Sequence, residues 1–139
     1  MKTTLNAIRK HSPCESGWVK LLAHLGKTKA DDEPLSILEI LKSNGLDDAL
    51  WCLRAVDGYD KEIRLYAVWC ARQVQHLMTD KRSLDALDVA EAFANGKATK
   101  AELLAARDAA RDAAWDAARE AQEKELRLIC LKIQEQEEK

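Results

Sequence analysis

The C-terminal stretch of the sequence constrains the fold more than any other part of the chain. From Thr99 to about Glu138 it contains no glycine and no proline, and nearly all of its residues are strong helix formers. Thr99 and Glu102 have the spacing of a capping box, which marks a helix start. At 1.5 Å per residue, an unbroken helix here would be about 58 Å long, longer than the body that the other residues can form. We therefore predict a single domain with a helical body over residues 1–98 and a long helix over residues 99–139 that packs on this body or extends from it.

A four-residue pattern repeats within this long helix. Its copies are Ala106-Arg107-Asp108-Ala109, Ala110-Arg111-Asp112-Ala113, Ala114-Trp115-Asp116-Ala117 and Ala118-Arg119-Glu120-Ala121. Because four residues exceed the 3.6-residue turn, each copy is rotated by about 40° from the last, so the alanines do not form the fixed seam of a coiled coil. Like charges four residues apart oppose the helix, and acid–base pairs three residues apart favour it by similar small amounts. The pattern predicts a rigid helix with a largely solvated surface.

Trp115 stands where this pattern predicts arginine, and two interpretations are open. In the first, the helix face is solvated and the indole docks on the protein's own body. In the second, Trp115 anchors a bound protein and is flanked by Arg111 and Arg119, because tryptophan and arginine are enriched among the residues that dominate binding energy. The candidate partner-binding residues are Arg107, Arg111, Asp112, Trp115, Asp116 and Arg119.

The rest of the chain predicts about six short helices, and therefore an all-α fold, a compact bundle with one long C-terminal helix. An apolar stripe at helical spacing is formed by Cys14, Trp18, Leu21, Leu22 and Leu25. The segment Ser12-Pro13-Cys14-Glu15 has the pattern of a helix start, with Ser12 as the N-cap. Helix ends are indicated at Gly26, Asn44-Gly45 and Asn95-Gly96.

A short phrase occurs twice in the middle of the chain. Ala49-Leu50-Trp51-Cys52-Leu53-Arg54 returns eighteen residues later as Ala67-Val68-Trp69-Cys70-Ala71-Arg72. Eighteen residues are five helical turns, so the two phrases are expected on equivalent faces of two helices that Asp57-Gly58 separates. We predict that the bundle is built on this Trp-Cys hairpin, that its Trp and Cys side chains are packing residues, and that the second arm is the most buried helix.

Charge and hydropathy narrow the classes of partner. Charged residues make up 33% of the chain but nearly cancel to a net charge of −2, and bases alternate with acids, so we expect no direct nucleic-acid binding. No apolar run approaches the roughly 18 to 20 residues of a membrane span, and no signal-peptide pattern is present. The sequence predicts a cytoplasmic protein without a membrane partner.

Few residues suggest chemistry. The four cysteines form no C-x-x-C pair, which favours free and mostly buried thiols. The three histidines have no metal-ligand spacing, and no nucleophile-elbow, P-loop or dinucleotide-binding motif occurs. We predict that the protein is not an enzyme and needs no cofactor or metal. The competing hypothesis is an enzyme or metal protein that uses Cys52, Cys70 and His76.

The last part of the long helix regains an apolar stripe. Leu126, Ile129, Cys130 and Ile133 follow helical spacing, and this stripe has to be covered by the same chain or by a second copy. A structural homodimer that assembles through the C-terminal helix is therefore a further alternative.

Several phrases resemble those of a family of small phage and prophage proteins labelled immunity proteins. Besides the alanine-arginine-aspartate tail, they are Ser12-Pro13-Cys14-Glu15-Ser16-Gly17-Trp18, Gly26-Lys27-Thr28-Lys29-Ala30-Asp31-Asp32-Glu33-Pro34-Leu35 and Asn44-Gly45-Leu46-Asp47-Asp48-Ala49-Leu50-Trp51. The resemblance covers nearly the whole chain. It implies an all-α, antitoxin-like inhibitor that neutralises a bacterial protein, such as a toxin, by direct binding in the host cytoplasm. An anti-CRISPR protein that disables a CRISPR-Cas surveillance complex is the alternative.

Overall fold

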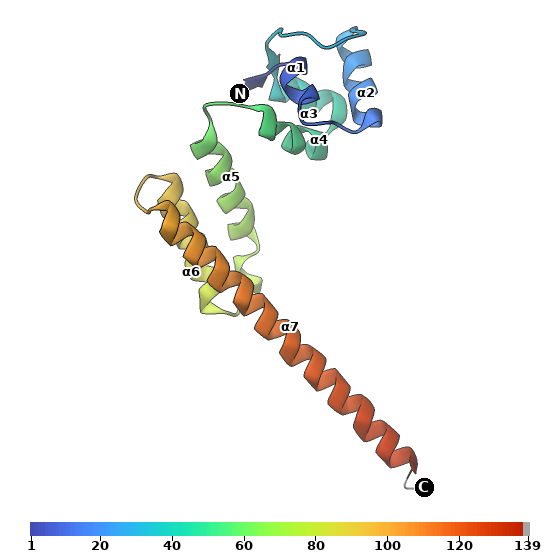
Figure 1. The fold of residues 1–139 in the computed structure, drawn as a ribbon, viewed down its shortest axis with the longest axis vertical. Coiled ribbons are helices and arrows are strands. Elements are labelled where there is room, and N and C mark those ends of the chain that lie inside the picture. The colour runs from blue at the N-terminus through green and yellow to red at the C-terminus, as the bar shows by residue number, and fades with distance from the viewer. Residues whose placement is uncertain (138–139) are drawn as a thin grey trace. The chain divides into compact units, whose positions relative to one another are not determined.

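The computed structural model describes residues 1–137, with side chains described up to residue 125 and at residues 127 and 128. Within this range it contains seven α-helices and one two-stranded pairing of two residues per strand, so the predicted all-α fold with six short helices and one long C-terminal helix is confirmed (Figure 1). The chain divides into two compact units, Met1–Ile63 and Arg64 onward. This division does not coincide with the predicted boundary between residues 98 and 99.

The first unit holds four short helices around one hydrophobic core. These are α1 (Leu5–Arg9), α2 (Glu15–Leu25), α3 (Ile37–Asn44) and α4 (Leu46–Cys52), and a 3₁₀ turn at Leu53–Ala55 follows α4. Strand β1 (Lys2–Thr3) pairs antiparallel with β2 (Leu35–Ser36), which ties the N-terminus to the start of α3. The core side chains are Leu5, Ile8, Trp18, Leu21, Leu35, Ile40, Ala49, Cys52 and Ala55.

Most helix ends in this unit follow the local sequence signals. Thr4 caps α1, and Gly26 ends α2 in the left-handed conformation with φ of 64°. The predicted N-cap at Ser12 is wrong, because α2 begins at Glu15 and its N-cap is Cys14. Ser12 has a φ of 55° and its N–H donates to the carbonyl of Arg9, so it completes the turn that leaves α1 and cannot adopt the extended backbone of an N-cap.

The second unit is organised by the pairing of two helices. It contains most of α5 (Asp60–Gln73), a 3₁₀ turn at Gln75–Leu77, α6 (Lys81–Ala94) and α7 (Lys100–Glu137). Helices α6 and α7 lie side by side (Figure 1). The less exposed positions of α7 include Leu103, Ala106, Ala110 and Ala113, which share one helix face. This alanine-rich face packs on α6, because small side chains allow a close approach of the two helices.

The predicted role of the Trp-Cys repeat in a central hairpin is wrong for its second copy. Trp69 is 57% exposed and Cys70 is exposed, and Val68 is the buried residue of α5. Arg72, which lies on the side of α5 next to Val68, bonds two carboxylates of α6, Asp88 at 2.8 Å and Glu91 at 2.6 Å. Cys52, from the first copy, belongs to the core of the first unit. The two copies therefore occupy different environments, and the second arm is not the most buried helix.

No helix in the described part of the chain is both long enough and apolar enough to span a membrane. The homodimer hypothesis rests on an apolar stripe whose side chains the structure does not describe, namely Leu126, Ile129, Cys130 and Ile133.

Candidate functional site

The six residues predicted to bind a partner lie along three turns of α7. Arg107, Arg111, Trp115 and Arg119 follow one another at four-residue intervals and so form one continuous row on the helix surface, which we call the basic ridge. Each step along the ridge turns about 40° around the helix axis. All four side chains are exposed. The structure thus brings three guanidinium groups and one indole onto one solvent-facing surface.

Trp115 lies away from the surface that packs on α6. Ala113, two positions earlier, is 3% exposed, and two helical residues rotate the chain by about 200°, so Trp115 stands on the far side of the helix. Its side chain is 66% exposed. An indole docked on the protein's own body would be mostly covered. The observed exposure therefore favours the interpretation in which Trp115 is available to a bound protein.

The two aspartates among the six predicted residues lie in different surroundings. Asp116 accepts a hydrogen bond from Arg82 of α6 at 3.0 Å, so it belongs to the junction between the two helices. The guanidinium of Arg82 also bonds Asp80, and these two carboxylates raise its pKa above the ordinary value, with Asp80 as the larger cause. Asp112 is exposed and lies on the acidic row beside the ridge.

The guanidinium groups of the ridge form few close ion pairs, although a row of acidic residues runs beside it along the helix. Arg111 lies 3.7 Å from Asp108, one turn earlier, in an exposed pair of the kind that contributes little energy. Within the described part of the chain, Arg107 and Arg119 form no ion pair. The ridge therefore presents positive charge on both sides of the indole.

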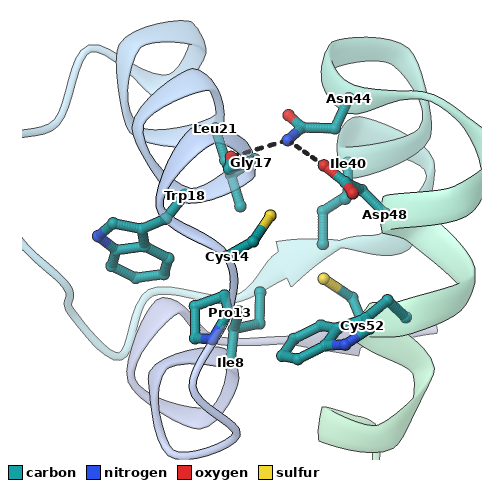
Figure 2. A pocket seen from close by; sticks show the side chains of 11 residues that line it. Ile8, Pro13, Cys14, Gly17, Trp18, Leu21, Ile40, Asn44, Asp48 and Cys52 are labelled. Atoms are coloured by element: carbon teal, nitrogen blue, oxygen red, sulfur yellow. Dashed lines mark hydrogen bonds between the residues drawn. The ribbon is translucent and has the colours of Figure 1, made fainter.

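A second site, which the sequence did not predict, is a cavity in the first unit. It has a volume of about 140 Å³, lies between α1, α2, α3 and α4, and is partly open to solvent, since Cys14 in its lining is exposed (Figure 2). Its apolar walls are Ile8, Pro13, Trp18, Leu21, Ile40 and Trp51. Figure 2 shows the side chains of Cys14 and Cys52 entering this space from opposite sides. Mostly apolar walls with a few polar groups are typical of a small-ligand site, and this cavity is smaller than most such sites.

One edge of the cavity is polar. The amide nitrogen of Asn44 donates to the carbonyl of Gly17 at 2.8 Å and to Asp48 Oδ2 at 2.7 Å. These bonds join α2 to the start of α4. Among the described residues, Asp48 forms no ion pair with a lysine or arginine, so a carboxylate faces the cavity without a cationic partner.

The surroundings of Cys52 favour its neutral thiol. Burial, and then the negative charge of Asp48, raise its pKa to about 11, and the opposing effect of Arg54 is smaller. The thiol is therefore protonated near neutral pH. Cys70 and His76 belong to the other unit, and no cluster of three or more potential metal ligands occurs among the described residues.

The cavity has no signature within one stretch of the sequence, because its polar edge combines residues from separate helices. Cys14 and Trp18 fit an apolar stripe, which predicts packing positions for both; Trp18 is buried, but Cys14 is exposed. The available signal was Gly17, a glycine inside an amphipathic helix, which often marks a close approach. A Cβ atom at Gly17 would lie 2.8 Å from Asp48 Oδ2 and 3.1 Å from the sulfur of Cys14.

No family model, curated protein or solved structure matches the chain. The fold and sites define its class as an all-α protein of two units, with an exposed basic ridge on a long C-terminal helix and a small cavity in the N-terminal unit. The relation to phage immunity proteins stays a prediction from the sequence phrases.

Proposed function

We propose that this protein is a non-enzymatic inhibitor that neutralises another protein by direct binding through the basic ridge of α7. The observation that carries the proposal is the exposure of Trp115 in the middle of that ridge. An exposed indole on a rigid helix can enter a pocket on a partner with little loss of conformational freedom, and it removes a large apolar surface from water when it does so.

The charges of the ridge define the kind of surface that it fits. Arg111 and Arg119 flank the indole and Arg107 extends the row by one more turn, which favours acidic groups on the partner on either side of an apolar pocket. Arginine side chains can bond carboxylates in a bidentate geometry, which adds specificity to the charge attraction. The resemblance to phage immunity proteins suggests a bacterial toxin as the partner, and a subunit of a CRISPR-Cas effector is the alternative.

The test is a comparison of two tryptophan variants in affinity capture from a lysate of the bacterial host. We expect the wild-type protein to retain one partner in stoichiometric amount, identified by mass spectrometry. Trp115→Ala should weaken this complex by about 2 kcal/mol or more, which is about 30-fold. Trp69→Ala is the matched control, because Trp69 is also exposed but lies on α5, and it should leave the capture unchanged.

Two further measurements distinguish inhibition from binding alone. The purified partner, whether a toxin or a CRISPR effector, should lose its activity when the wild-type protein is added and keep it when Trp115→Ala is added. Raised salt should weaken the complex because it screens the arginines. A partner captured equally by wild type and Trp115→Ala, or the absence of any stoichiometric partner, would contradict the proposal.

A further inference from the structure

We infer that the cavity in the first unit binds a small organic ammonium ion, that is, a protonated amine carried on an apolar body about the size of a benzene ring. This site is separate from the basic ridge, and the inference does not depend on the proposed inhibitory function.

The volume of the cavity sets the size of its ligand. At about 140 Å³ it is close to the engineered apolar cavity of about 150 Å³ that binds benzene in another protein. A whole peptide or nucleotide exceeds this volume. One ring or a short branched chain fits it, and the apolar walls cover the face of such a ligand that lies against them.

The aromatic walls are held in place from outside. The guanidinium of Arg9 lies 5.1 Å from the ring centre of Trp18, and that of Arg54 lies 4.3 Å from the ring centre of Trp51. Arg54 is fixed further by a hydrogen bond to the carbonyl of Trp51 at 2.8 Å. Because these contacts order the two rings before a ligand arrives, binding requires little reorganisation of the walls.

The polar edge selects for a hydrogen-bond donor with a positive charge. Asn44 directs its amide nitrogen to Gly17 and Asp48, which leaves acceptor positions on the Asp48 carboxylate. Asp48 lies in the first turn of α4, where the helix dipole offsets part of its charge. Asp48 is the only acidic side chain among the described residues that line the cavity, and no lysine or arginine lines it. An ammonium group is both a hydrogen-bond donor and a positive charge, whereas a carboxylate ligand is neither.

Gly17 keeps the polar edge open. Any side chain at this position would place its Cβ in contact with both Asp48 and Cys14. The displaced carboxylate would lose the hydrogen bond that it accepts from Asn44, and the added methyl group would take up space at the polar edge. Gly17→Ala should therefore close the site while leaving the helix intact, since alanine is the better helix former.

The experiment is a titration of the full-length, ¹⁵N-labelled protein with three probes of equal size. Benzylamine is the cation, benzyl alcohol is the neutral match and benzoate is the anion. We expect benzylamine to give saturable shifts in the amide resonances of residues 14, 17, 44 and 48. Benzyl alcohol should bind about tenfold more weakly, because a charge-assisted hydrogen bond is lost, and benzoate should not bind.

Two aspartate variants provide the matched control. Asp48→Asn keeps the shape of the side chain and its bond from Asn44, and it should reduce the affinity for benzylamine to that for benzyl alcohol. Asp47→Asn removes the same charge from the same turn of α4 at an exposed position that does not line the cavity, and it should leave the affinity unchanged. Gly17→Ala, with its fold verified from the amide spectrum, should abolish binding of both probes.

The inference is overturned if benzylamine gives no saturable shift, if benzyl alcohol binds equally well, or if Asp48→Asn and Asp47→Asn bind benzylamine alike. It is supported if only Asp48→Asn removes the preference for the amine.

Discussion

Replacing Trp115 with alanine separates the two interpretations of this residue by the size of its effect on stability. The side chain is 66% exposed, so about a third of its surface is covered in the folded protein. A fully buried tryptophan covers about 150–250 Å², which puts the covered area here at about 50–85 Å². At about 25 cal/mol per Å², this area contributes about 1–2 kcal/mol.

That contribution is an upper bound for the substitution. The unfolded chain already covers part of this surface, and alanine is the better helix former by about 0.5 kcal/mol. We therefore expect Trp115→Ala to lower the free energy of unfolding by about 1 kcal/mol or less. Trp18 gives the scale for a buried residue, because it is 8% exposed, and Trp18→Ala should cost about 3–5 kcal/mol.

Hydrogen exchange read out by mass spectrometry is the appropriate assay, because the two tryptophans lie in different units. Peptides from α2 should lose protection strongly in Trp18→Ala, and peptides from α6 and the first turns of α7 should change little in Trp115→Ala. A loss of about 3 kcal/mol or more in Trp115→Ala would refute the reasoning. It would mean that the indole packs on the protein itself and is not available to a partner.

Three further predictions concern other parts of the molecule. Ile40 is fully buried, so Ile40→Ala should destabilise the first unit by about 2–5 kcal/mol, measured by the same exchange assay, and an effect below about 1 kcal/mol would contradict its place in the core. Cys52 should react with iodoacetamide at pH 8 about 100-fold more slowly in the folded protein than in urea, because its pKa of about 11 leaves little thiolate; equal rates would contradict the burial of this thiol. Hydrogen bonds from the backbone N–H and then the hydroxyl of Thr99 lower the pKa of Glu102, so its contribution to the start of α7 should be present above the unfolded pKa near 4.5 and be lost as the pH falls through the lower, folded value. Glu102→Gln should flatten this acid dependence in circular dichroism, and an unchanged acid limb would count against the capping role.

The long helix was predictable because its signals are local. The backbone N–H and hydroxyl of Thr99 donate to the carboxylate of Glu102, and the N–H of Glu102 donates back to the hydroxyl, as the capping box requires. No residue inside the following stretch interrupts the helix. The exposure of the basic ridge was predictable from the same local pattern, because a row of arginines at four-residue spacing contains no apolar stripe that would have to be buried.

The orientation of α5 was not predictable, because its apolar residues surround the helix. Tyr66, Trp69 and Cys70 have helical spacing, but so do Leu65 and Val68, and either face satisfies the periodicity. Contacts with α6 determine which face of α5 packs against it. The guanidinium of Arg64 lies 4.8 Å from the ring centre of Phe93, and Arg72 forms ion pairs with two carboxylates of α6. Polar and cation–π contacts of this kind depend on tertiary position, and no pattern within α5 encodes them. The cavity escaped prediction similarly, since four helices converge to form it.

The length of α6 and the period of the repeat together suggest that Trp115 sets the register in which a partner could bind along the ridge. Helix α6 has 14 residues and α7 has 38, so α6 can cover only the first part of α7, and Arg82 in its first turn meets Asp116 near the end of that part. Along the ridge, a shift of four residues, which is about 6 Å with a rotation of about 40°, places one arginine on the position of the next. Charge alone would therefore allow a partner to bind in several registers of nearly equal energy. The indole breaks this equivalence, because one pocket on the partner can receive it in one register only. In the proposed complex, affinity for an acidic surface would come from the arginines, and the choice of position on that surface would come from Trp115.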